Sequence, residues 1–124
     1  MAITKSAITV FTSAAVPAGG TKAAPATGGT GTSVSTSSYG RSGLTYRIKN
    51  GASAPGAAGV MAIQISSDGA NWFDYQTMAG DTVANSDNSG TIVIDAYVQN
   101  VRALCYGHTT NQVTFEAILQ AIAG

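Results

Sequence analysis

The stretch "ISSDGANWFDY", residues 65–75, places a turn sequence between two apolar runs and then three aromatic side chains within four positions. Asp68 and Gly69 form a dipeptide that tolerates positive φ, so the chain is expected to reverse there. Residues 61–66 are then predicted to pair with residues 71–76. A hairpin at this position indicates a β-sheet protein.

The register of this hairpin decides which aromatic rings face the core. A two-residue turn places Trp72 opposite Ile65, and a three-residue loop places Phe73 there instead. A shift of one residue exchanges the core face of a strand for its surface face. We favour the longer loop, because it turns Phe73 and Tyr75 toward the apolar face of the preceding strand and leaves Asp74 in solvent.

In the favoured register Ile63 pairs with Tyr75, and Trp72 lies over the turn on the outer side of the sheet. An exposed indole offers a large apolar face and one hydrogen-bond donor, which suits stacking on a sugar or on a partner chain. The alternative, which we favour, is structural: Trp72 closes the end of the domain beside its own turn. The candidate interaction surface consists of Trp72, Tyr75, Tyr39 and Tyr106.

Alternation of apolar and polar residues predicts further strands along the chain. The predicted strands are residues 3–11, 44–49, 61–66, 71–78, 91–95, 101–107 and 113–121, with a polar loop over 77–90. Good helix formers follow residue 115, so a helix at the end of the chain stays the alternative for the last strand. Short strands joined by Gly-rich turns predict an all-β fold, an antiparallel β-sandwich that is either a jelly roll or immunoglobulin-like.

Residues 17–43 have a different composition, "PAGGTKAAPATGGTGTSVSTSSYGRSG". Val34 and Tyr39 are the only sizeable apolar side chains there, too few to hold such a segment on a core. We therefore expect one sandwich domain over residues 1–124, in which residues 17–43 form an extended N-terminal arm or a long loop. Fixing a residue costs of order 1–2 kcal/mol, so an ordered arm requires a neighbouring surface.

The charge content limits the classes of partner. Charged residues make up 10% of the chain, against about a quarter in a typical soluble domain. The 6 basic and 6 acidic residues cancel and are scattered singly, so the chain lacks the charge pattern of a protein that binds nucleic acid or anionic lipid. No apolar run approaches the roughly 20 residues of a membrane-spanning helix. From the charge pattern we expect no nucleic acid partner, and from the charge pattern and the short apolar runs we expect no membrane partner.

The sequence offers little for catalysis. His108 is the only histidine and lies in the turn "YGHTTNQ", where we expect it at the surface. Cys105 is the only cysteine, on an apolar strand face, so it forms no internal disulfide and no multi-cysteine zinc site. A nucleophilic Cys/His pair would need a thiol that the pattern places in the core. We predict a protein that is not an enzyme and has no cofactor.

Acidic residues suggest at most a weak metal site. In "NSDNSG", residues 85–90, the spacing of oxygen-bearing side chains matches the start of a calcium loop, but Ala96 stands where such a loop needs glutamate. A weaker calcium site built on Asp81 and Asp87 stays an alternative to an ordinary polar turn, which we favour. Carboxylate pairs require that the fold bring together residues distant in sequence, the candidates being Asp68, Asp74, Asp95 and Glu116.

Two levels of resemblance follow from these segments. The run "SSDGANWFDY" resembles the hairpin of several sandwich modules, discoidin-type domains among them. The wider layout looks like small tailed-phage virion proteins, including capsid decoration (cement) proteins. This likeness spans residues 43–119 and rests on an Ala/Ser/Thr-rich opening followed by "GLTYRIKNG", "AIQISSDGANWFDY" and "YVQNVRALCYGHTTNQVTFEAIL".

The resemblance to virion proteins implies a role without catalysis. It implies a homo-oligomer, with a trimer among the candidate forms, that is made in the host cytoplasm and sits on the capsid surface of the virion. Its partners would be further copies of itself and the major capsid protein or another virion protein, and it would stabilise the head shell. The alternatives are a tail or baseplate component and a carbohydrate-binding or adhesion module that uses Trp72 with Tyr75 or Tyr106.

Overall fold

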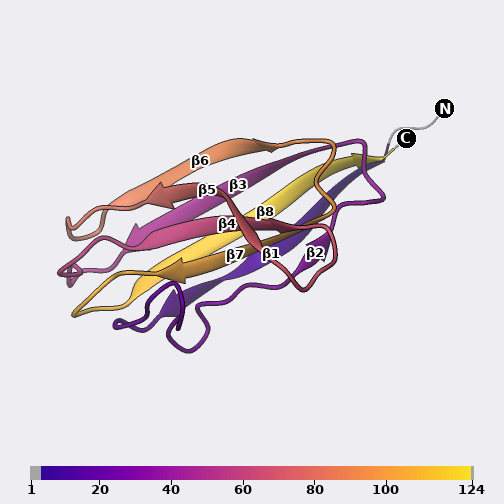
Figure 1. Cartoon of the computed structure of the whole chain (residues 1–124). Coiled ribbons are helices and arrows are strands. Elements are labelled where there is room, and N and C mark those ends of the chain that lie inside the picture. Colours follow the sequence, from indigo (N-terminus) through magenta and orange to yellow (C-terminus); the bar gives the residue numbers. More distant parts are fainter. Residues whose placement is uncertain (1–3, 124) are drawn as a thin grey trace.

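Two four-stranded antiparallel sheets pack face to face as a β-sandwich (Figure 1). The computed structural model describes residues 4–123. Sheet A has the order β1-β8-β3-β6, and sheet B has the order β2-β7-β4-β5. The strands are β1 (Thr4–Val16), β2 (Val34–Ser35), β3 (Arg41–Asn50), β4 (Val60–Ser66), β5 (Phe73–Ala79), β6 (Asp87–Ile94), β7 (Asn100–Tyr106) and β8 (Val113–Ala123).

The strand order is that of a jelly roll. Apart from β4 and β5, which form a hairpin within sheet B, each strand lies in the opposite sheet from the one before it. This alternation of sheets is what two Greek keys folded together produce. An immunoglobulin-like sandwich keeps its first two strands in one sheet, so that alternative is wrong and the all-β prediction is confirmed in its jelly-roll form.

The core forms between the sheets from the alternating apolar residues. Val113, Phe115, Ala117 and Leu119 of β8 are all fully buried, which confirms a strand and excludes the helix alternative. The Phe115 ring lies 6.3 Å from that of Phe11 in an edge-to-face arrangement. Burying one such large side chain stabilises the fold by about 1.5–3 kcal/mol.

Two strands extend furthest beyond their predicted bounds. β1 continues to Val16, and β6 begins at Asp87, inside the stretch predicted as a polar loop. β6 is an edge strand that pairs only with β3 in the described chain, and its residues before Ile94 are exposed or half-buried. Its sequence is therefore polar where a central strand would be apolar, and the apolar periodicity that predicts a strand is missing.

The predicted hairpin exists with one difference in register. Ile65 pairs with Phe73, as the longer loop requires, but a bulge at Tyr75 places Gln76 opposite Ile63. The prediction that Ile63 pairs with Tyr75 is therefore wrong. Phe73 lies on the expected face, yet it is 68% exposed because the sandwich ends there.

The turn itself is held by Asp68. Its carboxylate accepts hydrogen bonds from the backbone N–H groups of Ala70 and Asn71, both at 2.8 Å, and from the Ser66 hydroxyl. These backbone bonds, that of Asn71 first, hold the pKa of Asp68 far below its ordinary value. Gly69 adopts φ 77°, the left-handed conformation that the dipeptide predicts.

Residues 17–43 form a long loop and not an extended arm. Gly31 N–H donates to the Ala103 carbonyl at 2.8 Å, and the Gly29 carbonyl accepts from Cys105 N–H at 2.7 Å. The short strand β2 then pairs with the start of β7, and residues 41–43 already belong to β3. Backbone hydrogen bonds to the domain's own β7 hold this segment, and Val34, which is buried in the core, adds an apolar contact.

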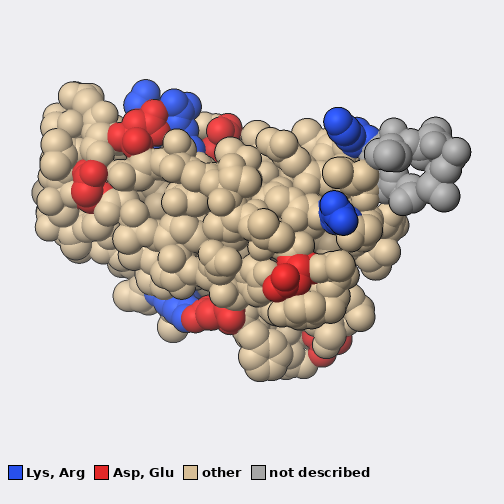
Figure 2. Space-filling model, turned by 90° about the horizontal axis from the view of Figure 1, so that it is seen from above, with Lys and Arg blue, Asp and Glu red and all other residues tan. Residues whose placement is uncertain are grey.

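Charged side chains are sparse on the surface. Figure 2 shows a few Lys, Arg, Asp and Glu side chains, some of them side by side, on a face that is otherwise neutral. Among residues 4–123 two ion pairs form, Lys22 with Asp74 and Arg47 with Asp87. No helix in the described chain is long and apolar enough to cross a membrane.

Candidate interaction surface

Trp72 lies in a chain of side-chain contacts on the outer face of sheet B. It is half-buried, and the Arg102 guanidinium carbon lies 4.5 Å from the centre of its ring. Arg102 donates to Gln64 at 2.9 Å, Gln64 donates to Asp74 at 3.0 Å, and Asp74 forms an ion pair with Lys22. The indole is therefore part of a polar network and does not present both of its faces to solvent.

The network spans β7, β4, β5 and the loop before β2, and it covers part of sheet B. Ala62 and Gln64 of β4 and Leu104 of β7 are buried although they point away from the core. Burial lowers the pKa of Arg102, and the hydrogen bond from Lys22 lowers the pKa of Asp74. We call this outer face of sheet B the covered face.

Tyr75 joins the two sheets at their open edge. Its hydroxyl donates to the Asp95 carboxylate at 2.7 Å and accepts from the Asp95 backbone N–H at 3.1 Å. Desolvation, followed by the hydrogen bond to Asp95, raises the pKa of Tyr75. Since β5 is the edge of sheet B and Asp95 follows the edge strand of sheet A, this contact closes the sandwich on that side.

The other two predicted residues lie apart from each other. Tyr39 is half-buried beside the core in the turn before β3. Tyr106 is half-buried where β7 ends, whereas Trp72 lies at the opposite end of sheet B, beside the start of β7. The structure thus does not bring Tyr106 into one patch with Trp72, and a binding role for the four residues stays a prediction.

His108 is not a surface residue, contrary to the expectation from its turn sequence. It is fully buried, with Nε2 2.7 Å from the Val16 carbonyl oxygen and its ring 5.4 Å from that of Phe115. Cys105 is fully buried as predicted, and burial raises the pKa of its thiol far above the ordinary value. Neither side chain is placed to meet a substrate.

The acidic residues bind separate partners. Asp87 forms its ion pair with Arg47, while Asp81 accepts hydrogen bonds from Ser86 at 2.5 Å and from Asn88 at 3.2 Å. The polar-turn interpretation of Asp81 therefore accounts for its contacts. In residues 4–123 no group of three His, Cys, Asp or Glu side chains could hold a metal ion.

Exposed apolar side chains gather at the end of the sandwich where β6 leads into β7. Phe73 and Tyr97 line one shallow hollow, and Val93 and Ile122 line another. Tyr97 is 70% exposed and Val93 72% exposed. The sequence analysis did not single out Val93, Tyr97 or Ile122, although an aromatic residue in a short turn, such as Tyr97, is a detectable signal.

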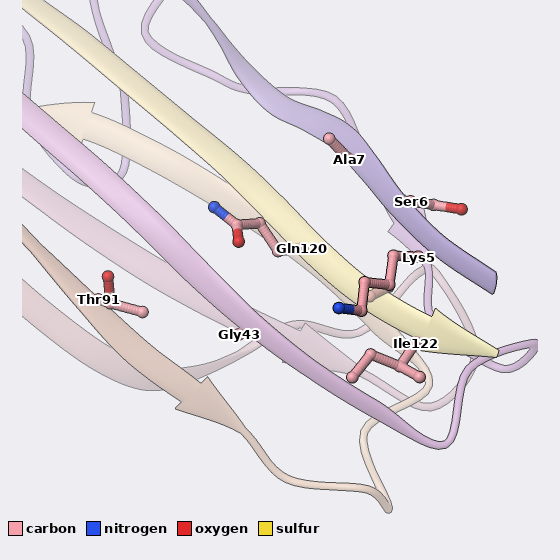
Figure 3. Close-up of a pocket in the computed structure, with 8 residues that line it drawn as sticks. Lys5, Ser6, Ala7, Gly43, Thr91, Gln120 and Ile122 are labelled. Atoms are coloured by element: carbon pink, nitrogen blue, oxygen red, sulfur yellow. The ribbon is translucent and has the colours of Figure 1, made fainter. Parts of the chain in front are cut away.

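A wider hollow lies on the outer face of sheet A (Figure 3). It has a volume of about 540 Å³, adjoins a second hollow of about 390 Å³, and shares Gly43, Gln120 and Ile122 with it. Strand pairing places Gly43 in a cross-strand row between Gln120 and Val93. We call the two concavities together the Gly43 hollow and the surface around it the open face.

No protein-family model matches the chain, and no curated protein matches its sequence at a significant level. Solved structures do share its fold. The SPBc2 prophage-derived protein YomS has a TM-score of 0.52 and 15% identity, over 98% of this chain and 96% of that one.

Two further structures of similar fold come from a virus and a bacterium. A chain in the structure of infectious bursal disease virus, Gx strain, has a TM-score of 0.55 and 14% identity, over 98% of this chain and 32% of that one. The K3 cleaved adhesin domain of Lys-gingipain from Porphyromonas gingivalis w83 has a TM-score of 0.55 and 13% identity, over 88% of this chain and 71% of that one. At such identities the likeness shows a shared β-sandwich and no specific family.

Proposed function

We propose that this protein is a non-enzymatic structural component of a phage virion, a capsid decoration protein that self-associates and stabilises the head shell. The observation that carries the proposal is the set of exposed apolar side chains at one end of a jelly roll with few charged residues and no net charge. A soluble monomer gains nothing from exposing Phe73, Val93 and Tyr97 together, whereas an assembly buries them.

The comparisons support the proposal at the level of fold. A jelly roll is an architecture that viral capsid proteins use, and the prophage-derived protein matches this chain over nearly the full length of both. The buried settings of His108 and Cys105 also favour a role that needs no nucleophile. The partners would be further copies of the chain and the major capsid protein, and the location would be the virion surface.

Particle composition tests the proposal. Particles are purified from cells that express the gene in its native genome and from a deletion strain, then compared by mass spectrometry, cryo-electron microscopy and heat resistance. We expect many copies of the protein on the head and earlier heat-induced rupture of the deletion heads. Absence of the protein from particles would overturn the proposal, and density confined to the tail would replace decoration with a tail or baseplate role.

The adhesion alternative has weaker support in the geometry. Arg102 occupies one face of Trp72, and the residues lining the Gly43 hollow include no aromatic side chain for stacking on a sugar. Stacking of a sugar on that face would therefore need Arg102 to leave the indole.

A further inference from the structure

Two exposed aromatic rings line one hollow at the end of the sandwich. Phe73 and Tyr97 are both largely exposed, and both line a hollow of about 180 Å³, which we call the Tyr97 hollow. Val93 and Ile122, which are also exposed at this end, line a different hollow. The exposed apolar side chains therefore divide into two sets, and contacts between copies through Val93 and Ile122 do not require the Tyr97 hollow.

The faces of both rings are free within residues 4–123. In this part of the chain the aromatic pairs form in the core around Phe115, and the cation that lies over a ring is Arg102 on Trp72. Neither kind of contact covers Phe73 or Tyr97. The apolar C–H face of a sugar ring stacks on a free aromatic face, which these two side chains provide.

The backbone holds both rings in place before a ligand arrives. Tyr97 lies in the turn that Val98 N–H closes on the Asp95 carbonyl at 3.0 Å, and the buried Val98 side chain anchors this turn in the core. Phe73 pairs with Ile65 at the start of β5, directly after the hairpin turn. Because the backbone under both rings is already fixed, binding orders less of the chain, which favours affinity.

Uncharged polar groups complete the lining of the Tyr97 hollow. Ser67 and Gln99 line it beside the rings and are exposed, and in residues 4–123 neither side chain has a hydrogen-bond partner. The residues that line the hollow include no charged side chain. A hydroxyl and an amide each donate and accept hydrogen bonds, so these groups match a neutral ligand that carries hydroxyl groups.

The size of the hollow favours a small unit of such a ligand. Pockets for drug-sized ligands measure about 300–1,000 Å³, and the Tyr97 hollow is smaller, at about 180 Å³. It therefore suits one sugar ring at a time. A proline-rich peptide also docks on exposed aromatic residues, but it lies along an extended groove, which a hollow of this size does not offer.

We propose that the Tyr97 hollow binds one neutral sugar unit of an oligosaccharide. Phe73 and Tyr97 stack on the sugar, and Ser67 and Gln99 form hydrogen bonds with its hydroxyl groups. Trp72 does not line this hollow, so the site is separate from the indole. The inference goes beyond the proposed function and does not rest on it. A single small site binds weakly, and many copies on one particle would raise the overall affinity for a surface that displays the sugar.

A glycan array followed by calorimetry tests the site. The biotinylated full chain, presented on streptavidin, is applied to neutral oligosaccharides of glucose, galactose, mannose and N-acetylhexosamines. We expect it to bind a subset of them, and the strongest is then titrated in solution. Tyr97→Ser and Phe73→Ser should each weaken binding at least about tenfold, whereas Tyr97→Phe keeps the ring and should bind within about threefold of the wild type.

A control and a second measurement separate the site from other effects. Val83→Ser changes an exposed apolar residue outside the hollow and should bind like the wild type, and thermal melting confirms that each variant folds. In NMR spectra of the labelled chain, the oligosaccharide should shift the signals of Ser67 and of the Gln99 side-chain amide more than that of the Trp72 indole.

Four outcomes would overturn the inference. They are the failure of every neutral oligosaccharide to bind, binding that survives the loss of both rings, NMR shifts confined to Trp72 and Arg102, and binding of proline-rich peptides in place of sugars. Each measurement uses the isolated chain, whereas the proposed function is tested on particles. Failure of the sugar site and failure of the decoration role are therefore separate results.

Discussion

The polar side chains on the two outer faces of this sandwich differ in how completely they find hydrogen-bond partners. On the covered face of sheet B, Gln64 is buried and links Arg102 to Asp74. On the open face of sheet A, Gln120 is exposed and its side-chain amide lies 3.4 Å from the Thr45 hydroxyl, its only side-chain hydrogen-bond partner among residues 4–123. Both sheets pack against the same core through their inner faces, so packing against the core does not explain the difference between their outer faces.

The difference shows where the molecule is complete by itself. The covered face is closed by its own loop, whose Lys22 reaches Asp74 of β5. The open face keeps a hollow at Gly43 and two cations without an ion-pair partner in the described chain. The covered face is therefore satisfied within the chain and the open face is not, and the following predictions test this contrast in order of expected effect.

Acid should cause the largest loss of stability, because four carboxylates share the effect. Hydrogen bonds and ion pairs lower the pKa values of Asp68, Asp74, Asp81 and Asp87 in the folded chain. A lowered folded-state pKa gives stability that is present above the unfolded value of about 3.9 and is lost as the pH falls through the folded pKa. We expect the melting temperature to fall steadily below about pH 4, measured by circular dichroism.

The variant Asp68→Asn isolates the turn on this acid limb. In the wild type the Asp68 carboxylate accepts hydrogen bonds from the backbone N–H groups of Asn71 and Ala70. The variant should therefore melt at a lower temperature at neutral pH, and its melting temperature should depend less on pH in acid. A melting temperature that stays constant down to about pH 2 would show that these carboxylates do not stabilise the fold.

Matched glutamine variants test the covered face directly. Gln64→Ala removes the side chain between two charged groups, and we expect it to lower the free energy of unfolding by about 2–3 kcal/mol. Gln120→Ala on the open face should change it by less than about 0.5 kcal/mol. Urea denaturation measures both. Equal losses in the two variants would mean that the faces do not differ in the way described.

Sequence periodicity predicted the parts of the fold that depend on the core. Phe115 and Leu119 alternate with polar residues, and burial on one side of a strand requires this pattern. The order of the strands was not predictable, because jelly-roll and immunoglobulin-like sandwiches bury the same pattern. The bulge at Tyr75 also left no signal in the sequence, since it depends on how β5 meets β4.

The covered and open faces were harder to predict than the core. The loop before β2 holds to β7 through the backbones of Gly29 and Gly31, and backbone hydrogen bonds leave no side-chain pattern. His108 gave no sign of burial, because a single histidine in a polar turn is usually exposed. A signal for the open face was present in Gly43, which is a glycine within an alternating strand.

Tyr75 tests the edge between the two faces. Tyr75→Phe keeps the ring and removes the hydroxyl that joins β5 to Asp95. We expect a loss of about 1 kcal/mol in the free energy of unfolding, because a net hydrogen bond contributes about this much. Tyr39→Phe is the control, since Tyr39 donates its backbone N–H to the Thr36 carbonyl and this bond does not involve its hydroxyl. A loss no larger than that of the control would show that the Asp95 contact does not hold the edge closed.

The smallest expected effect concerns sugar binding on the covered face. Trp72 is the only tryptophan, so fluorescence excited beyond the tyrosine absorption band reports this side chain alone, and Arg102 already lies over its ring. Titration with soluble oligosaccharides should therefore leave the emission unchanged, while Arg102→Leu should alter it by uncovering the indole. If a glycan quenches the wild type, and Trp72→Ala abolishes binding measured by calorimetry, the covered face is a binding surface in its own right. The contrast between a self-satisfied face and an open one would then fail, because each face would have a partner.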